Sequence, residues 1–131
     1  MRLGASLLLA LVITPAATAA IFVELRTTTV HRGGLVHLVG NAHALPLYAV
    51  ATAKLSLCRR TDTCTGLERR ARPPRKPYVS IGRAPGSGTS TRPFALRLPR
   101  SLLHGRYRIF VWCKPCGGSL IPAVGQLRVA S

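Results

Sequence analysis

The side chains that could act as catalytic acids or bases are few. The 131 residues include only three carboxylates, Glu24, Asp62 and Glu68. Asp62 and Glu68 lie in a run dense in arginine, whose charges would keep both carboxylates ionised rather than ready to donate a proton. Paired-carboxylate glycoside hydrolysis is therefore disfavoured, and the sequence has no nucleophile elbow or phosphate-cradling glycine loop. We predict that the protein is not an enzyme and needs no cofactor or metal.

One motif could carry redox chemistry. Trp112-Cys113-Lys114-Pro115-Cys116 resembles the W-C-x-P-C motif of thioredoxin-like proteins, in which the first thiolate is activated at a helix N-terminus. In that fold a long helix and several strands follow the motif. Only 15 residues follow Cys116 here, and they include Gly117, Gly118 and Pro122. A thioredoxin fold is therefore not expected, but an exported thiol–disulfide protein that uses this motif stays open as the alternative function.

The N-terminal segment predicts export. Residues 1–19 have a basic residue at Arg2, an apolar run over 3–13 and small residues at the end, which is the pattern of a signal peptide. The expected mature chain is 20–131, and it has no further stretch apolar enough to span a bilayer. We expect a secreted protein, extracellular or associated with the cell envelope, whose cysteines form disulfides.

The mature chain predicts strands. Apolar and polar residues alternate in short segments between glycine, proline and asparagine, which is typical of strands with one buried face. Seven segments are expected to be strands: 21–26, 34–40, 47–58, 79–81, 94–98, 107–113 and 127–129. The segment 34–40 is nearly continuously apolar and ends at Gly40-Asn41, whereas the others show the alternation. The segment 47–58 is also rich in alanine, so a helix is left open there. The pattern predicts one all-β domain, an antiparallel β-sandwich of about seven strands.

Parts of this pattern resemble secreted bacterial immunoglobulin-like domains. HRGGLVHLVG at 31–40 is similar to their G-x-x-V-x-V-x-G second strand, LHGRYRI at 103–109 to their L-x-G-x-Y-x-I entry into the sixth strand, and 127–129 to their last strand. The resemblance covers most of the mature chain and implies a single immunoglobulin-like β-sandwich. It also implies a tyrosine corner at Tyr107, whose hydroxyl would bond back to the connecting turn. Trp112 departs from antibody domains, which place the tryptophan on the third strand.

The four cysteines can pair in three ways, and the sequence alone does not choose between them. In a sandwich of the kind that the resemblance implies, the third and sixth strands are antiparallel neighbours, so Cys58 and Cys113 lie at opposite ends of the pair. A six-residue strand is about 20 Å long, whereas bridged Cα atoms lie within about 7 Å of each other. We therefore expect Cys58–Cys64 and Cys113–Cys116. This separation argues against a four-cysteine zinc site, although a smaller site of Cys113, Cys116 and His43 is left open.

The chain is strongly basic. Its 19 Lys and Arg residues against 3 Asp and Glu give a formal net charge of +16, to which the codon bias of a GC-rich Gram-positive genome could contribute. The densest group of cations lies in a predicted loop over 59–77 and comprises Arg59, Arg60, Arg69, Arg70, Arg72, Arg75 and Lys76. In an exported protein such a loop would attract anionic cell-wall polymer or phospholipid headgroups. Nucleic acid is disfavoured, because no recognition helix is readable and aromatic residues do not interleave with the arginines.

Together these features predict a secreted, non-enzymatic module of the cell envelope. Proteins that the chain resembles are mostly adhesion, spacer or binding modules, which implies an interaction or spacer role. The expected partners are an unidentified protein or an anionic envelope polymer bound through the arginine-rich loop.

Overall fold

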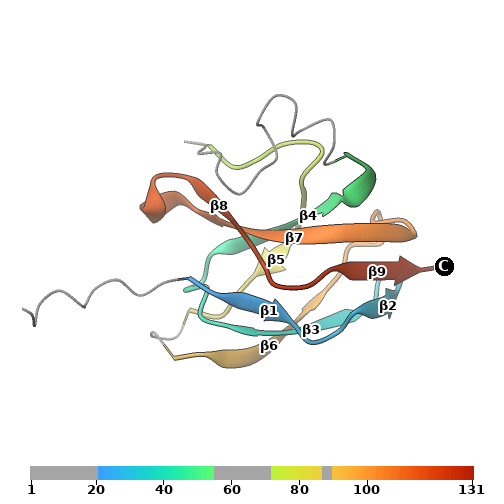
Figure 1. The fold of residues 1–131 in the computed structure, drawn as a ribbon, viewed down its shortest axis with the longest axis horizontal. Helices are drawn as coiled ribbons and strands as arrows, with labels where there is room; N and C mark the ends of the chain where they lie inside the picture. Colours follow the sequence, from blue (N-terminus) through green and yellow to red (C-terminus); the bar gives the residue numbers. More distant parts are fainter. Residues whose placement is uncertain (1–20, 55–71, 87–89) are drawn as a thin grey trace, which may run out of the picture.

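The computed structural model describes residues 21–54, 72–86 and 90–131. They form nine β-strands and a short 3-10 helix, with a helical segment at 52–54, so the predicted all-β class is confirmed (Figure 1). The elements are β1 (Val23–Leu25), β2 (Thr29–His31), β3 (Leu35–Gly40), β4 (Pro46–Ala51), β5 (Val79–Arg83), β6 (Arg92–Arg97), β7 (Gly105–Cys113), η1 (Lys114–Cys116), β8 (Ser119–Pro122) and β9 (Leu127–Ala130). The prediction of about seven strands was too low, because β2 and β8 are too short to show a clear alternation.

β3 is the centre of a three-stranded sheet. It pairs antiparallel with β1 on one side and with β6 on the other. Val36 and Leu38 are buried while Leu35 and His37 are exposed, so one face of the sheet packs into the core and the other faces solvent. Pro93 lies inside β6, not before it as the sequence predicted. β6 tolerates this proline because it is an edge strand with a partner on only one side.

β7 is the longest strand and the centre of a six-stranded sheet. The order is β2-β9-β7-β4-β5, and β8 also pairs with β7. β4 runs antiparallel to β7, which confirms that the predicted third and sixth strands are neighbours. β9 pairs with the first half of β7 and β8 with the second half. Because β2 pairs with β9, in parallel, the N-terminal segment contributes β1 to one sheet and β2 to the other.

The two sheets are also hydrogen-bonded to each other, at Val124. The Val124 N–H donates to the Val23 carbonyl oxygen at 2.8 Å, and the Leu25 N–H donates to the Val124 carbonyl oxygen at 3.0 Å. This bridge pairs Glu24 of β1 with Val124, which lies in the connection from β8 to β9 (Figure 1). The sheets therefore curl toward each other on this side of the molecule.

Apolar side chains are buried on both faces of the six-stranded sheet. The main core lies between the sheets and takes residues from both, such as Leu38 and Ile109. A second cluster, which we call the outer aromatic cluster, comprises Tyr48, Val50, Tyr78, Phe110, Trp112 and Leu120. Side chains along β7 alternate in direction, so Ile109 belongs to the main core while its neighbour Phe110 belongs to the outer aromatic cluster. A strand buried on both faces reads as a continuous apolar run, as β7 does from Ile109 to Cys113.

The predicted strand over 47–58 is a strand only in its first part. β4 ends at Ala51 and residues 52–54 are helical. The strand prediction is therefore confirmed for 47–51, and the helix that was left open is found at 52–54. The rest of that segment, the predicted signal peptide 1–19 and the predicted disulfide Cys58–Cys64 lie outside the described residues. In the described part of the chain, no helix has the length and hydropathy needed to cross a bilayer.

Candidate functional site

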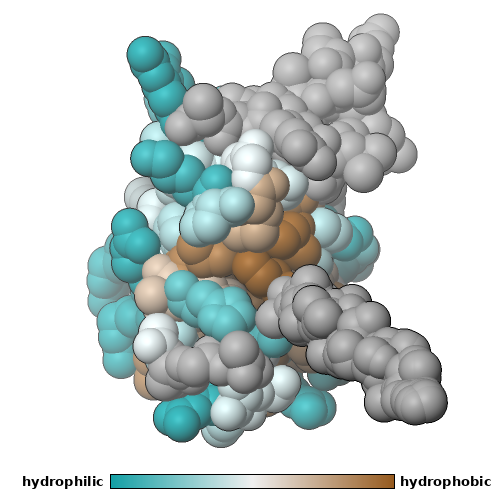
Figure 2. Space-filling model, turned by 90° about the vertical axis from the view of Figure 1, so that its left-hand side faces the viewer, coloured by the Kyte–Doolittle hydropathy of each residue, from teal (hydrophilic) through white to brown (hydrophobic). Residues whose placement is uncertain are grey.

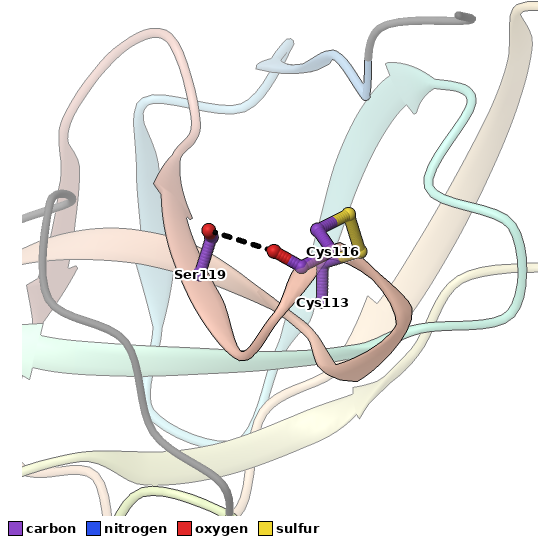
Figure 3. The surroundings of a disulfide bond; sticks show 3 residues. All are labelled: Cys113, Cys116 and Ser119. Atoms are coloured by element: carbon purple, nitrogen blue, oxygen red, sulfur yellow. Dashed lines mark hydrogen bonds between the residues drawn. A yellow bond between two sulfur atoms is a disulfide. The ribbon is translucent and has the colours of Figure 1, made fainter.

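The Cys113–Cys116 disulfide closes the turn between β7 and β8. The predicted pairing is present, with the two Cα atoms 5.1 Å apart. Cys113 is the last residue of β7 and pairs in register with Ser119. The Ser119 hydroxyl donates to the Cys116 carbonyl oxygen at 3.2 Å (Figure 3). The Gly118 N–H donates to the Cys113 carbonyl oxygen at 3.0 Å, so the sulfur bridge and the backbone close the same turn.

This turn differs from a redox site in which the first cysteine is the nucleophile. Cys113 is only 1% exposed, whereas Cys116 is exposed. A thiolate formed at Cys113 would be a charge in an apolar core, which is costly without a partner. η1 is three residues long and has no side-chain cap, so it offers little of the helix dipole that activates such thiols. The geometry therefore suits a bridge that stabilises the hairpin.

Removing both cysteines tests this role. The Cys113→Ala/Cys116→Ala variant is expected to lose about 2 kcal/mol of unfolding free energy, because a short disulfide loop restricts the unfolded chain by about that amount. Urea denaturation measures the loss. Lys114→Ala is the control, because Lys114 is exposed in the same turn and its replacement should cost less than about 0.5 kcal/mol. Equal stability of the double variant and the wild type would contradict a stabilising bridge.

Tyr107 makes the hydrogen bond that the resemblance implies. Its hydroxyl donates to the Leu103 carbonyl oxygen at 2.8 Å, across the loop that leads into β7. Burial raises the pKa of the Tyr107 phenol above its ordinary value. Burial also raises the pKa of Tyr48, and the charge of Arg83 opposes that rise in part. Because both pKa values are raised, the two phenols stay neutral near pH 7 and are not poised for proton transfer there.

The Tyr107→Phe variant is expected to lose about 1 kcal/mol of unfolding free energy at neutral pH, the net value of one hydrogen bond. The pKa of Tyr107 is higher in the folded than in the unfolded chain, so its contribution is fully present below about pH 10 and is lost as pH rises through the folded pKa. Denaturation of both proteins from pH 7 to above pH 10 checks this. The gap between them should narrow at high pH; a gap that widens would contradict the assignment.

The predicted anion-binding loop is described only at its end. Arg72, Arg75 and Lys76 are exposed and precede β5. Arg59, Arg60, Arg69 and Arg70 lie outside the described residues. The Tyr78 N–H donates to the Arg75 carbonyl oxygen at 2.8 Å, which connects this end of the loop to the outer aromatic cluster.

Three other arginines lie together although the sequence separates them. These turn arginines are Arg32, between β2 and β3, Arg97, at the end of β6, and Arg100, just after β6. Arg32 and Arg97 both donate to backbone carbonyls in this region. Their grouping has no signal in the sequence, because it depends on the pairing of β3 with β6 and not on local spacing.

The end of the molecule opposite the turn arginines carries the disulfide turn, and its surface is partly apolar. Figure 2 shows hydrophobic residues in the middle of this end, with hydrophilic residues around them. Three partly buried residues that pack against the main core come from elements at this end: Ile21 before β1, Leu45 before β4 and Ile121 in β8. The two ends of the sheets therefore differ in chemistry.

A metal centre is not supported within the described residues. No group of three or more His, Cys, Asp or Glu side chains there could hold an ion. The zinc site considered for His43 needs free thiols at Cys113 and Cys116, but their sulfurs are bonded to each other. His43 instead lies in the connection to β4 with a positive φ of 47°.

The chain matches no protein family model and no curated protein sequence.

Proposed function

We propose that the protein is a secreted, non-enzymatic, immunoglobulin-like module of the cell envelope that binds anionic envelope polymer or phospholipid headgroups. The observation that carries this proposal is the unneutralised positive charge. Glu24 is the only side-chain carboxylate among the described residues, and its single ion pair there is with Arg26, at 3.9 Å and largely exposed. Most cations therefore have no acidic partner in the described part of the chain, and the positive potential favours polyanions.

Two features support the architecture within this proposal. The described strands form two β-sheets that enclose the main core, and the Tyr107 hydroxyl donates to the Leu103 carbonyl oxygen, as the hydroxyl of a tyrosine corner would. The signal-peptide pattern of residues 1–19 supports export. In an exported protein the polyanions within reach are wall polymers and lipid headgroups, which are preferred over nucleic acid for that reason.

The binding proposal is tested with the mature chain, residues 20–131. We expect it to sediment with purified anionic cell wall and with vesicles containing anionic lipid, and not with vesicles of phosphatidylcholine alone. Binding should be lost in about 0.5 M salt, where the Debye length falls to about 4 Å. No binding at low salt, or binding unchanged in high salt, would overturn the proposal.

The thiol–disulfide alternative keeps one favourable observation, the exposure of Cys116. An insulin-reduction assay separates the two functions. Turnover by the mature chain that is abolished by Cys113→Ser would establish the redox function, whereas no turnover would leave the binding module as the proposal.

A further inference from the structure

The turn arginines surround one tight turn. The Gly34 N–H donates to the His31 carbonyl oxygen at 2.8 Å, and Gly33 has a φ of +73°, which glycine adopts without strain. The turn is joined to the end of β6, because the Leu98 N–H donates to the Gly34 carbonyl oxygen at 2.9 Å. The backbone thus brings residues around position 33 and residues 97–100 together as one unit.

The arginine side chains are held against this unit. The Arg32 Nε–H donates to the Arg100 carbonyl oxygen at 2.7 Å, and the Arg97 Nη1–H donates to the Gly33 carbonyl oxygen at 3.1 Å. A Cβ built on Gly33 would lie 3.1 Å from Cγ and 3.9 Å from Cζ of Arg100, so the Arg100 side chain lies along the turn. A guanidinium group has five N–H donors. Most donors therefore stay available on side chains that are already positioned.

No carboxylate side chain of the described residues neutralises the turn arginines. Among the described residues the ion pair is that of Arg26 with Glu24, and Glu24 lies in β1 and not at the turn. Like charges grouped on one turn repel each other. An anion bound between them would remove this repulsion and accept the free N–H groups.

Further cations lie at the same end of the sheets. The register pairs His31 with Ala130 and Gly105 with Val129, so the turn, the start of β7 and the end of β9 meet there, at the right in Figure 1. Arg106 and Arg128 face each other across β7 and β9, and both are exposed. A directly opposed like-charge pair is unfavourable within a sheet. It also adds to the positive potential that would draw an anion to the turn.

We infer that the turn arginines form a binding site for a phosphate group. Arginine forks match the oxygens of phosphate in bidentate geometry, and three guanidinium groups suit a phosphate monoester, which has three free oxygens and up to two negative charges. A carboxylate, with two oxygens and one charge, would leave part of this set unused. The inference rests on the proposed function and deepens it, because it names the anionic group and the site that binds it.

Titration of the mature chain with inorganic phosphate, followed by amide NMR, tests the site. We expect amide shifts at residues 32–34 and 97–100. Arg32→Gln/Arg97→Gln should weaken phosphate binding by at least about tenfold, because each lost charged hydrogen bond is worth about a factor of ten or more. Arg92→Gln is the matched control, since Arg92 is an exposed arginine at the other end of β6. It should change the affinity by less than about twofold, because an exposed site away from the anion makes no contact with it.

The outcomes separate this site from the general function. An equal loss in Arg92→Gln, or an unchanged affinity in Arg32→Gln/Arg97→Gln, would overturn the phosphate site, even if the wild type still binds cell wall. Phosphate binding at the turn without any binding to wall or anionic vesicles would support the site and overturn the envelope function.

Vesicles containing phosphatidic acid identify the source of the phosphate. If Arg32→Gln/Arg97→Gln loses vesicle binding together with phosphate binding, the site takes a lipid headgroup. If only phosphate binding is lost, the site takes a phosphate carried by a soluble molecule or polymer. Amide spectra of the variants exclude misfolding as the cause of either loss.

Discussion

The Gly40→Ala variant should lose about 3 kcal/mol of unfolding free energy, near the upper end of the cost of forcing extra volume into a packed site. Gly40 is buried at the end of β3 and pairs in register with Val23 of β1. A Cβ at this position would overlap the carbonyl oxygen of Phe22 and would lie 2.9 Å from the Cα of Val23. Both neighbours are backbone atoms, so β1 itself would have to move.

The displaced strand would lose more than one contact. The Asn41 N–H donates to the same Phe22 carbonyl oxygen at 2.9 Å, and the Phe22 N–H donates to the Asn41 side-chain oxygen at 2.7 Å. Urea denaturation measures the effect. His37→Ala is the control on the same strand; its exposed side chain should contribute less than about 0.5 kcal/mol. A Gly40→Ala protein as stable as the control would show that β1 does not pack closely against β3.

The Phe110→Ala variant should lose about 3–5 kcal/mol, the usual cost of deleting a buried phenyl ring. Phe110 is 4% exposed and lies in the outer aromatic cluster. Its ring is 5.9 Å from the ring of Tyr78, at an interplanar angle of 71°, and Tyr78 makes a similar edge contact with Tyr48 at 6.5 Å. Such edge contacts add to the burial term.

Denaturation followed by the fluorescence of Trp112, the single tryptophan, reports on this cluster directly, because Trp112 belongs to it. Phe110→Leu is the matched control, since it keeps most of the apolar volume and should cost less than about 1.5 kcal/mol. If alanine and leucine have the same small effect, the outer face of the six-stranded sheet does not contribute a packed core.

The sequence was sufficient to predict those strands that have one buried and one exposed face. In β1, Val23 and Leu25 alternate with the polar Glu24, so the sequence predicted their shared face, and both are buried. β3 was predicted as a strand, but its nearly continuous apolar run did not show which face is buried. β7 was predicted as a strand, but the outer aromatic cluster was not. Phe110 and Trp112 pack against residues from β4, β8 and the segment before β5, and local periodicity does not encode those partners. The short strand β2 was missed for the same reason, because it is defined by its pairing with the distant β9. β8 pairs with β7 in a local hairpin and was missed because its four residues show no clear alternation.

Of the candidate sites, the disulfide turn could be predicted from the sequence and the turn arginines could not. Cys113 and Cys116 are close in sequence, so a local turn already limits how far apart they can lie. The turn arginines come from two strand ends that meet only after β3 and β6 have paired. Clusters of charge along the sequence, such as the loop over 59–77, are visible without a structure. Clusters that depend on strand register are not.

The parallel pairing of β2 with β9 affects how the chain folds. The register pairs Thr29 of β2 with Arg128 of β9. β2 therefore cannot join the six-stranded sheet until β9, the last strand, is present. Contacts this distant in sequence give a high contact order, which slows folding because a long loop must close before the contact is gained. Until the last strand has been synthesised, β2 therefore has no partner in the six-stranded sheet, and this sheet can be completed only at the end of synthesis.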